Sequence, residues 1–132
     1  MYSSTLVGEV RRVVEAVKAT YGEFKLAMLY NSHLDARTNW NLIVAADWAD
    51  ERGVAEATRI IAEELHKQVG PENRSAVSRI TVLRTSDPFV MDMARLHPYA
   101  SSGGGVWLTQ VAAGDVTEGA GYIYYAQPAV AA

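Results

Sequence analysis

The segments WNLIVAADW (residues 40–48), VAEATRIIAEELHKQV (residues 54–69) and SRITVLRT (residues 78–85) decide the fold of this chain. The first and the last are apolar or alternating runs, which are typical of strands, and the middle one repeats its apolar residues at helical spacing. A strand–helix–strand crossover lays its two strands parallel and puts the helix on one face of the sheet. We therefore predict that residues 40–48 and 78–85 lie side by side and run in the same direction.

Further elements extend this unit toward both ends of the chain. Helical spacing of apolar residues predicts a first helix that begins near Thr5 and stops at Gly22. Residues 24–30 read as a strand that reaches residues 40–48 through a polar loop, residues 31–39. Asp87-Pro88 is a typical helix start, because Asp accepts from free N–H groups and Pro lacks one, and it predicts a short helix over residues 88–96.

The last third of the chain predicts a hairpin of two strands, residues 106–111 and 122–126, joined by a glycine-rich loop. Alternation places Tyr122 and Tyr124 on one face of its second strand and Tyr125 on the opposite face. Residues 98–105, with three consecutive glycines, are expected to form a hinge, and residues 128–132 a frayed tail.

These elements predict a single α+β domain over residues 1–132 in the order α-β-β-α-β-α-β-β. We expect one mixed sheet of about five strands with the two main helices packed on one face. The opposite face would then need a second layer, a partner or side chains that tolerate solvent.

Composition narrows the classes of function. The 132 residues are 49% hydrophobic and 20% charged, carry a formal net charge of −3 and include no cysteine. The absence of cysteine excludes disulfides, thiol catalysis and cysteine-ligated metals. The mild negative charge disfavours nucleic acid as a partner, and no apolar run approaches the ~20 residues that span a bilayer. We expect a soluble, cytoplasmic protein without a membrane partner.

A first polar cluster is expected where the two parallel strands end. Ligands tend to bind beyond the carboxyl ends of parallel strands, at the N-termini of the helices that follow. The candidate ligand-binding residues there are Asp47, Trp48, Asp50, Arg84, Ser86 and Asp87. The competing interpretation is that Asp50 and Asp87 cap helices while Asp47 pairs with Arg84 or Arg52.

A second candidate is the loop that carries His33, Asp35 and Arg37. A histidine and an aspartate two residues apart can share a metal ion or form a base with its orienting carboxylate. No second histidine stands at ligand spacing, so a solvated loop is the simpler interpretation. We predict no metal and no cofactor.

A third candidate is the aromatic hairpin, with Trp107, Tyr122, Tyr124 and Tyr125. Tyrosine combines apolar area with a polar tip, which suits protein interfaces and equally suits cross-strand pairs. A homodimer built across this hairpin would satisfy both interpretations. The hairpin, residues 106–126, contains no Lys or Arg, which argues against single-stranded nucleic acid.

The piece Leu29-Tyr30-Asn31-Ser32-His33, followed by Trp40-Asn41-Leu42-Ile43-Val44, resembles small nucleotidyltransferase domains. Those domains carry a Gly-Ser turn after one strand and an Asp-x-Asp pair that opens the next. Here Asn31-Ser32 stands at the Gly-Ser position, and Asn39 and Asn41 stand where metal-binding aspartates are expected. Amides are poor substitutes for carboxylates at a two-metal site, so the resemblance implies an inactive copy.

The element order is also similar to that of roadblock-type and other profilin-like modules, which are dimeric scaffolds without catalysis. The long loop over residues 31–39 and the helix after Asp87 depart from that pattern. We therefore expect a non-catalytic protein-interaction or ligand-binding module that acts as a homodimer. The alternative is a small-molecule or metal-dependent enzyme whose site lies at the carboxyl ends of the strands 40–48 and 78–85.

Overall fold

The centre of the fold is an antiparallel pair of strands, and a third strand lies parallel to the second strand of that pair. The computed structural model describes residues 4–31, 39–97, 105–108 and 120–127. Strand β1 (Leu26–Asn31) pairs antiparallel with β2 (Trp40–Ala45), and β2 pairs parallel with β3 (Val77–Val82). The predicted parallel neighbours are therefore confirmed.

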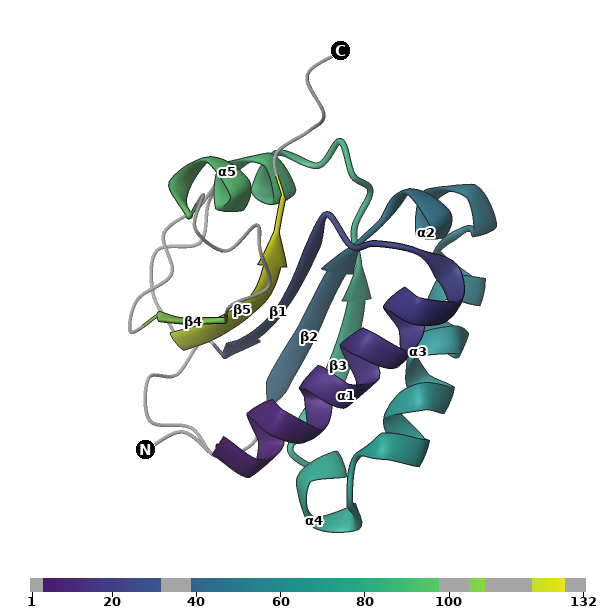
Figure 1. Ribbon diagram of the computed structural model, residues 1–132, viewed down its shortest axis with the longest axis vertical. Helices are drawn as coiled ribbons and strands as arrows, with labels where there is room; N and C mark the ends of the chain where they lie inside the picture. Colours follow the sequence, from purple (N-terminus) through teal and green to yellow (C-terminus); the bar gives the residue numbers. More distant parts are fainter. Residues whose placement is uncertain (1–3, 32–38, 98–104, 109–119, 128–132) are drawn as a thin grey trace.

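Two C-terminal strands complete a mixed sheet on the other side of β1. Strand β5 (Ala120–Ala126) pairs antiparallel with β1, and β4 (Val106–Leu108) pairs antiparallel with β5, so the strand order is β3-β2-β1-β5-β4 (Figure 1). The α+β class, the mixed sheet and the predicted pairing of the last two strands are confirmed. Most of the predicted hairpin loop, most of the predicted hinge and the predicted tail lie outside the described residues, and β5 begins at Ala120, two residues before the predicted strand.

In the described residues, five helices connect and cover the strands. In chain order they are α1 (Ser4–Tyr21), α2 (Asp47–Arg52), α3 (Val54–Gln68), α4 (Pro71–Arg74) and α5 (Pro88–Leu96). Helices α1, α3 and α5 agree with their predicted positions to within two residues. Helix α4 is a single turn that begins at a proline, where the sequence predicts only a polar turn.

The prediction that residues 40–48 form one strand is wrong at its end. Strand β2 stops at Ala45, and α2 begins at Asp47 because the backbone N–H groups of Ala49 and Asp50 donate to the carbonyl of Ala46. Gly53 then ends α2 at φ +94°, a conformation that glycine adopts without steric cost. Trp48 therefore belongs to a helix, where its ring packs against Tyr21 and Phe24.

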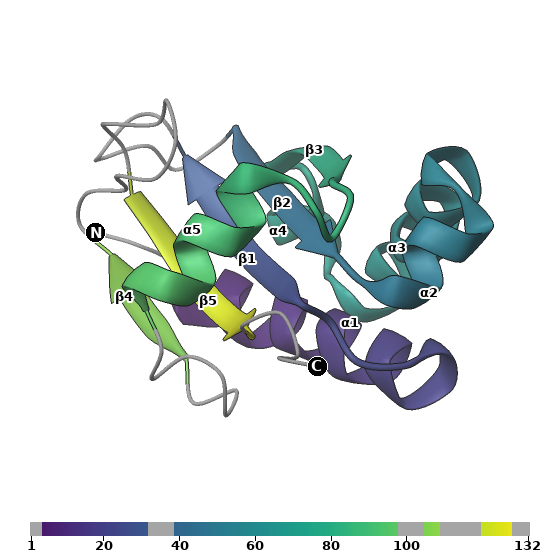
Figure 2. The same cartoon turned by 90° about the horizontal axis from the view of Figure 1, so that it is seen from above.

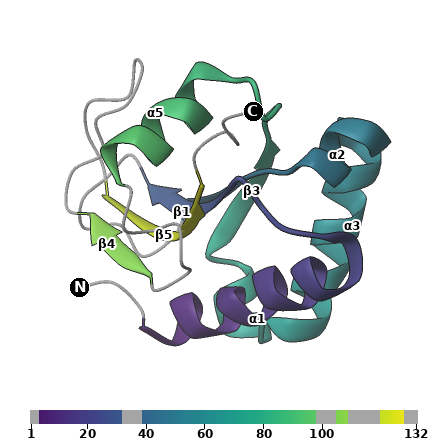
Figure 3. The ribbon, with the colours of Figure 1, turned by 45° about the horizontal axis from the view of Figure 1, so that its top comes forward.

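The two faces of the sheet are covered by different helices, and Figures 2 and 3 show α1 and α5 on opposite sides of it. Helices α1 and α3 bury their apolar stripes on one face together with Leu29, Leu42 and Val44. This arrangement confirms that the two main helices share a face. On the second face, Val90 and Met93 of α5 pack on a smaller cluster, which consists of Leu26, Met28, Ile43, Ala45, Ile123 and Ala126.

An irregularity in β5 changes which tyrosines share a face. Ala27 pairs with Tyr125 and Met28 pairs with Ile123, so Tyr124 has no residue opposite it in β1. Such a bulge interrupts the alternation of side chains along a strand. Tyr125, which alternation places opposite Tyr124, therefore joins it on the α1 face, and both belong to the larger core.

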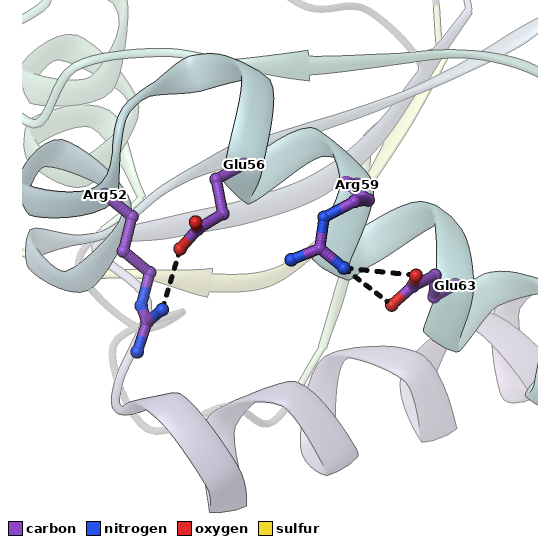
Figure 4. A network of polar contacts seen from close by, with 4 residues as sticks. All are labelled: Arg52, Glu56, Arg59 and Glu63. Atoms are coloured by element: carbon purple, nitrogen blue, oxygen red, sulfur yellow. Dashed lines mark hydrogen bonds and ion pairs between the residues drawn. The ribbon is translucent and has the colours of Figure 1, made fainter.

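The outer surface of α2 and α3 carries ion pairs. Arg52 pairs with Glu56 at 2.7 Å and Arg59 with Glu63 at 3.1 Å (Figure 4). All four side chains are more than 40% exposed, so each pair contributes at most about 0.5 kcal/mol. Within the described ranges, no helix is both long enough and apolar enough to cross a bilayer.

Candidate functional site

The structure engages two aspartates of the predicted strand-end cluster in local contacts. The carboxylate of Asp50 accepts from the hydroxyl of Thr85 at 2.6 Å and from its backbone N–H at 3.3 Å. Asp50 thereby ties α2 to the segment between β3 and α5. The carboxylate of Asp87 accepts from the backbone N–H of Phe89 at 2.8 Å and caps α5. The competing prediction that both aspartates cap helices is therefore confirmed for Asp87 and wrong for Asp50, which lies inside α2.

The residues of the predicted strand-end cluster do not gather around one cavity. Asp50 and Arg84 line a space of about 90 Å³ at the junction of α2, α3 and β3. Asp47 and Trp48 line a different space of about 230 Å³ between α2 and the start of β1. Ser86 is exposed and lines neither space. Asp47 is exposed and forms no ion pair with Arg84 or Arg52.

Trp48 is 7% exposed, and its ring centroid lies 5.3 Å from that of Tyr21 and 5.9 Å from that of Phe24. Its indole Nε1 is buried without a hydrogen-bond acceptor among the described residues. The side chain thus contributes mainly apolar packing to the core.

The second predicted candidate, His33, Asp35 and Arg37, lies outside the described residues.

The predicted aromatic interface is turned largely toward α1 of the same chain. Tyr124 is fully buried and donates to the carbonyl of Val7 at 2.7 Å. Tyr125 donates to the carboxylate of Glu15 at 2.6 Å, and the hydroxyl of half-buried Tyr122 accepts from Arg11 at 3.3 Å. Trp107 pairs with Tyr122 across β4 and β5. The three tyrosines therefore hold α1 on the sheet.

A different polar group forms at the other end of the sheet, on the face that carries α5. Tyr30, Asn41 and Arg79 lie directly opposite one another on β1, β2 and β3. They alternate with residues of the larger core and therefore point to the α5 face. Helix α5 covers this face nearer the opposite end of β1, around Leu26 and Met28.

These three residues line a cavity of about 320 Å³ together with Asn39 and Ser78. We call this cavity the polar pocket. Its volume is at the lower end of the range of small-molecule sites, about 300–1,000 Å³. All five residues are polar, Arg79 carries the single charge among them, and none is a carboxylate. The described lining of the polar pocket therefore combines side chains that can donate hydrogen bonds with one positive charge.

Two backbone irregularities shape the polar pocket. The pairing of β2 with β3 shifts between Trp40, which faces Val77, and Asn41, which faces Arg79, so Ser78 is an extra residue in β3. Bulges of this kind redirect side chains at sheet edges. Asn39 has φ +65°, a left-handed conformation that asparagine tolerates better than most residues, and it leads directly into β2.

The polar pocket lies where β2 and β3 begin, at the opposite end of the sheet from the predicted strand-end cluster. The available signal was the interruption of two apolar strands by Asn41, Arg79 and Thr81. Asn41 and Thr81 interact, since the hydroxyl of Thr81 donates to Oδ1 of Asn41 at 2.9 Å. Which of these side chains meet depends on the register.

In the part of the chain that the structure describes, no three His, Asp or Glu side chains are grouped so that they could hold a metal ion. Comparison with protein-family models, with curated proteins and with solved structures gives no match for this chain.

Proposed function

We propose that this domain is a non-catalytic module that binds a small polar ligand in the polar pocket. The observation that carries the proposal is the row formed by Tyr30, Asn41 and Arg79, which three strands of a rigid sheet hold in register. Side chains on strands are positioned more precisely than side chains on loops, which favours a defined ligand geometry.

The chemistry of the lining residues supports binding rather than catalysis. General acid–base catalysis most often uses a His, Asp, Glu or Lys within hydrogen-bond reach of the substrate, and none of these is among the described residues that line the polar pocket. Tyrosine can also serve in that role, and Tyr30 is the one described lining residue of such a type. Ser78 lines it, but a serine becomes a nucleophile only beside a base. The similarity to nucleotidyltransferases points the same way, because Asn39 and Asn41 occupy positions where that family uses carboxylates.

The alternative, an enzyme with its site at the carboxyl ends of β2 and β3, has less support. Asp50 and Asp87 are occupied by Thr85 and by the first turn of α5. A metal site or a general base there would need a carboxylate that is available to the substrate. Asp47 is available, but it lies at a different cavity from Arg84.

The proposal is tested by a fragment screen followed through ¹H–¹⁵N correlation spectra of the labelled protein. We expect the amide signals of Tyr30, Asn41 and Arg79 to shift for a subset of polar fragments. The variant Asn41→Ala should lose these shifts, whereas Asn73→Ala, at the end of α4, should keep them. Fragments that shift only signals around Asp47 or Arg84 would contradict the proposal.

A further inference from the structure

We propose that the polar pocket holds the phosphate group of a small molecule directly, without a metal ion. The inference rests on the function proposed above and names the class of ligand. It follows from the charge of the lining residues, from the direction of their hydrogen-bonding groups and from the way the strands present them.

Arg79 supplies the charge. Its side chain lines the polar pocket, and no described carboxylate lies within ion-pair distance of its guanidinium group. An arginine without an acidic partner keeps its donors for a ligand, and its planar fork matches two oxygens of a phosphate. None of the described residues that line the polar pocket is a carboxylate, so none of them repels an anion.

Asn41 supplies an oriented amide. Its Oδ1 accepts from Thr81 at 2.9 Å, which leaves Nδ2 as the part of the amide that can donate to a ligand. Since Asn41 faces Arg79 directly across the strands, the amide and the guanidinium group can contact neighbouring oxygens of one anion.

Ser78 and Asn39 add further donors at the rim. The extra residue in β3 brings Ser78 to the polar pocket beside Arg79, and the left-handed conformation of Asn39 precedes Asn41 by two residues. Phosphate offers several oxygens in a tetrahedral arrangement, which suits donors that approach from different strands. A planar carboxylate has only two oxygens and would leave some of these donors unused.

A metal ion suits the same residues poorly. Mg²⁺ and Ca²⁺ are bound largely by carboxylate oxygens, and a cation would meet the positive charge of Arg79. Amides at positions 39 and 41 remove the negative charge that a metal would need. Binding of phosphate should therefore be independent of divalent cations and should weaken with salt, because Arg79 is exposed.

The experiment titrates inorganic phosphate into the ¹⁵N-labelled protein at about pH 7.5, where the dianion is the major form of phosphate. Ionic strength is held constant with NaCl, EDTA is present, and sodium acetate serves as a second titrant. We expect saturable shifts of the Tyr30, Asn41 and Arg79 amides with phosphate and at least about tenfold weaker binding of acetate.

Three variants and one control separate the contributions. Arg79→Gln should weaken phosphate binding at least about tenfold, and Arg79→Lys should weaken it less, because the charge remains while the fork is lost. Asn41→Asp keeps the acceptor for Thr81 and adds a negative charge, so it should abolish binding. The control Arg12→Gln makes the same charge change on an exposed position of α1 and should leave binding unchanged.

The outcomes also separate this inference from the proposed function. Equal binding by Arg79→Gln with a native-like spectrum, or binding that appears only when Mg²⁺ replaces EDTA, would overturn the phosphate assignment. If phosphate fails while neutral fragments still shift the Tyr30 and Asn41 amides, only the class of ligand is wrong. If neither binds, the proposed function falls as well.

Discussion

Tyr124 joins the first helix to the last strand through one hydrogen bond. Its ring is fully buried, the guanidinium group of Arg11 lies 5.1 Å from the ring centroid, and the hydroxyl donates to the carbonyl of Val7. Contacts separated by 117 residues cannot form before the chain has folded, so this side chain reports on the docking of α1. Two predictions concern it.

Replacing Tyr124 by Phe should lower the free energy of unfolding by about 1 kcal/mol, because the part-buried hydrogen bond from its hydroxyl to the carbonyl of Val7 is lost. Tyr125→Phe should cost less, since its partner, Glu15, is exposed and can bind water instead. Urea denaturation followed by circular dichroism measures both. A larger loss for Tyr125→Phe would show that the Val7 contact is unimportant.

Burial raises the pKa of Tyr124 above the ordinary tyrosine value of about 10. An unfolded chain therefore loses this proton near pH 10 while the folded protein keeps it, and unfolding releases a proton above that pH. Stability should fall as the pH rises beyond about 10, with Tyr124 contributing up to about 1.4 kcal/mol per pH unit. Urea midpoints measured from about pH 8 to about pH 11 should decline less steeply in Tyr124→Phe.

At the scale of elements, the capping and bracing aspartates behave differently from an exposed one. Asp87→Ala removes the acceptor for the backbone N–H of Phe89 at the start of α5 and should cost about 1 kcal/mol. Asp47→Ala changes an exposed residue without an ion pair and should cost about 0.5 kcal/mol or less. Thermal unfolding of both variants checks the difference, and equal effects would argue against the cap.

Helix α5 supplies the layer that the second face of the sheet requires. Met93 lies on the side of α5 that faces the sheet and is fully buried, whereas Met91 on the same helix is 52% exposed. Met93→Ala should lower the free energy of unfolding by about 2–5 kcal/mol, and Met91→Ala should change it by about 0.5 kcal/mol or less. If the two variants unfolded at the same urea concentration, α5 could not be packed on β1 and β5 as described.

At the scale of the whole molecule, the homodimer expected from the aromatic hairpin stays a prediction. The contacts of Tyr124 and Tyr125 with α1 lie within one chain, so a dimer across the hairpin would have to use other atoms of β4 and β5. Light scattering at high micromolar concentration should report twice the 14.4 kDa of one chain if the prediction holds. A mass of one chain at every concentration would remove it.

Local signals carried most of the fold. The helical period of residues 54–69 and the apolar runs before and after it were enough to predict the parallel crossover. Asp87-Pro88 likewise predicted the start of α5. Each of these signals depends only on neighbours in the sequence. The end of β2 was misjudged, because the apolar pattern of residues 46–48 is compatible with a strand, whereas Asp47 and Trp48 lie in α2, where Trp48 packs on Tyr21 and Phe24.

The sequence alone thus determined the class of fold, the parallel pair and the two helices that share a face, since periodicity and caps are properties of short segments. Only the tertiary structure decided that Tyr30, Asn41 and Arg79 meet at one pocket, that Asp47 lies apart from Arg84, and that Tyr125 turns toward α1. The first and the last of these outcomes depend on strand register and on two bulges, and the second depends on where β2 gives way to α2. Register and bulges are selected by packing on both faces of the sheet at once, which no short segment encodes.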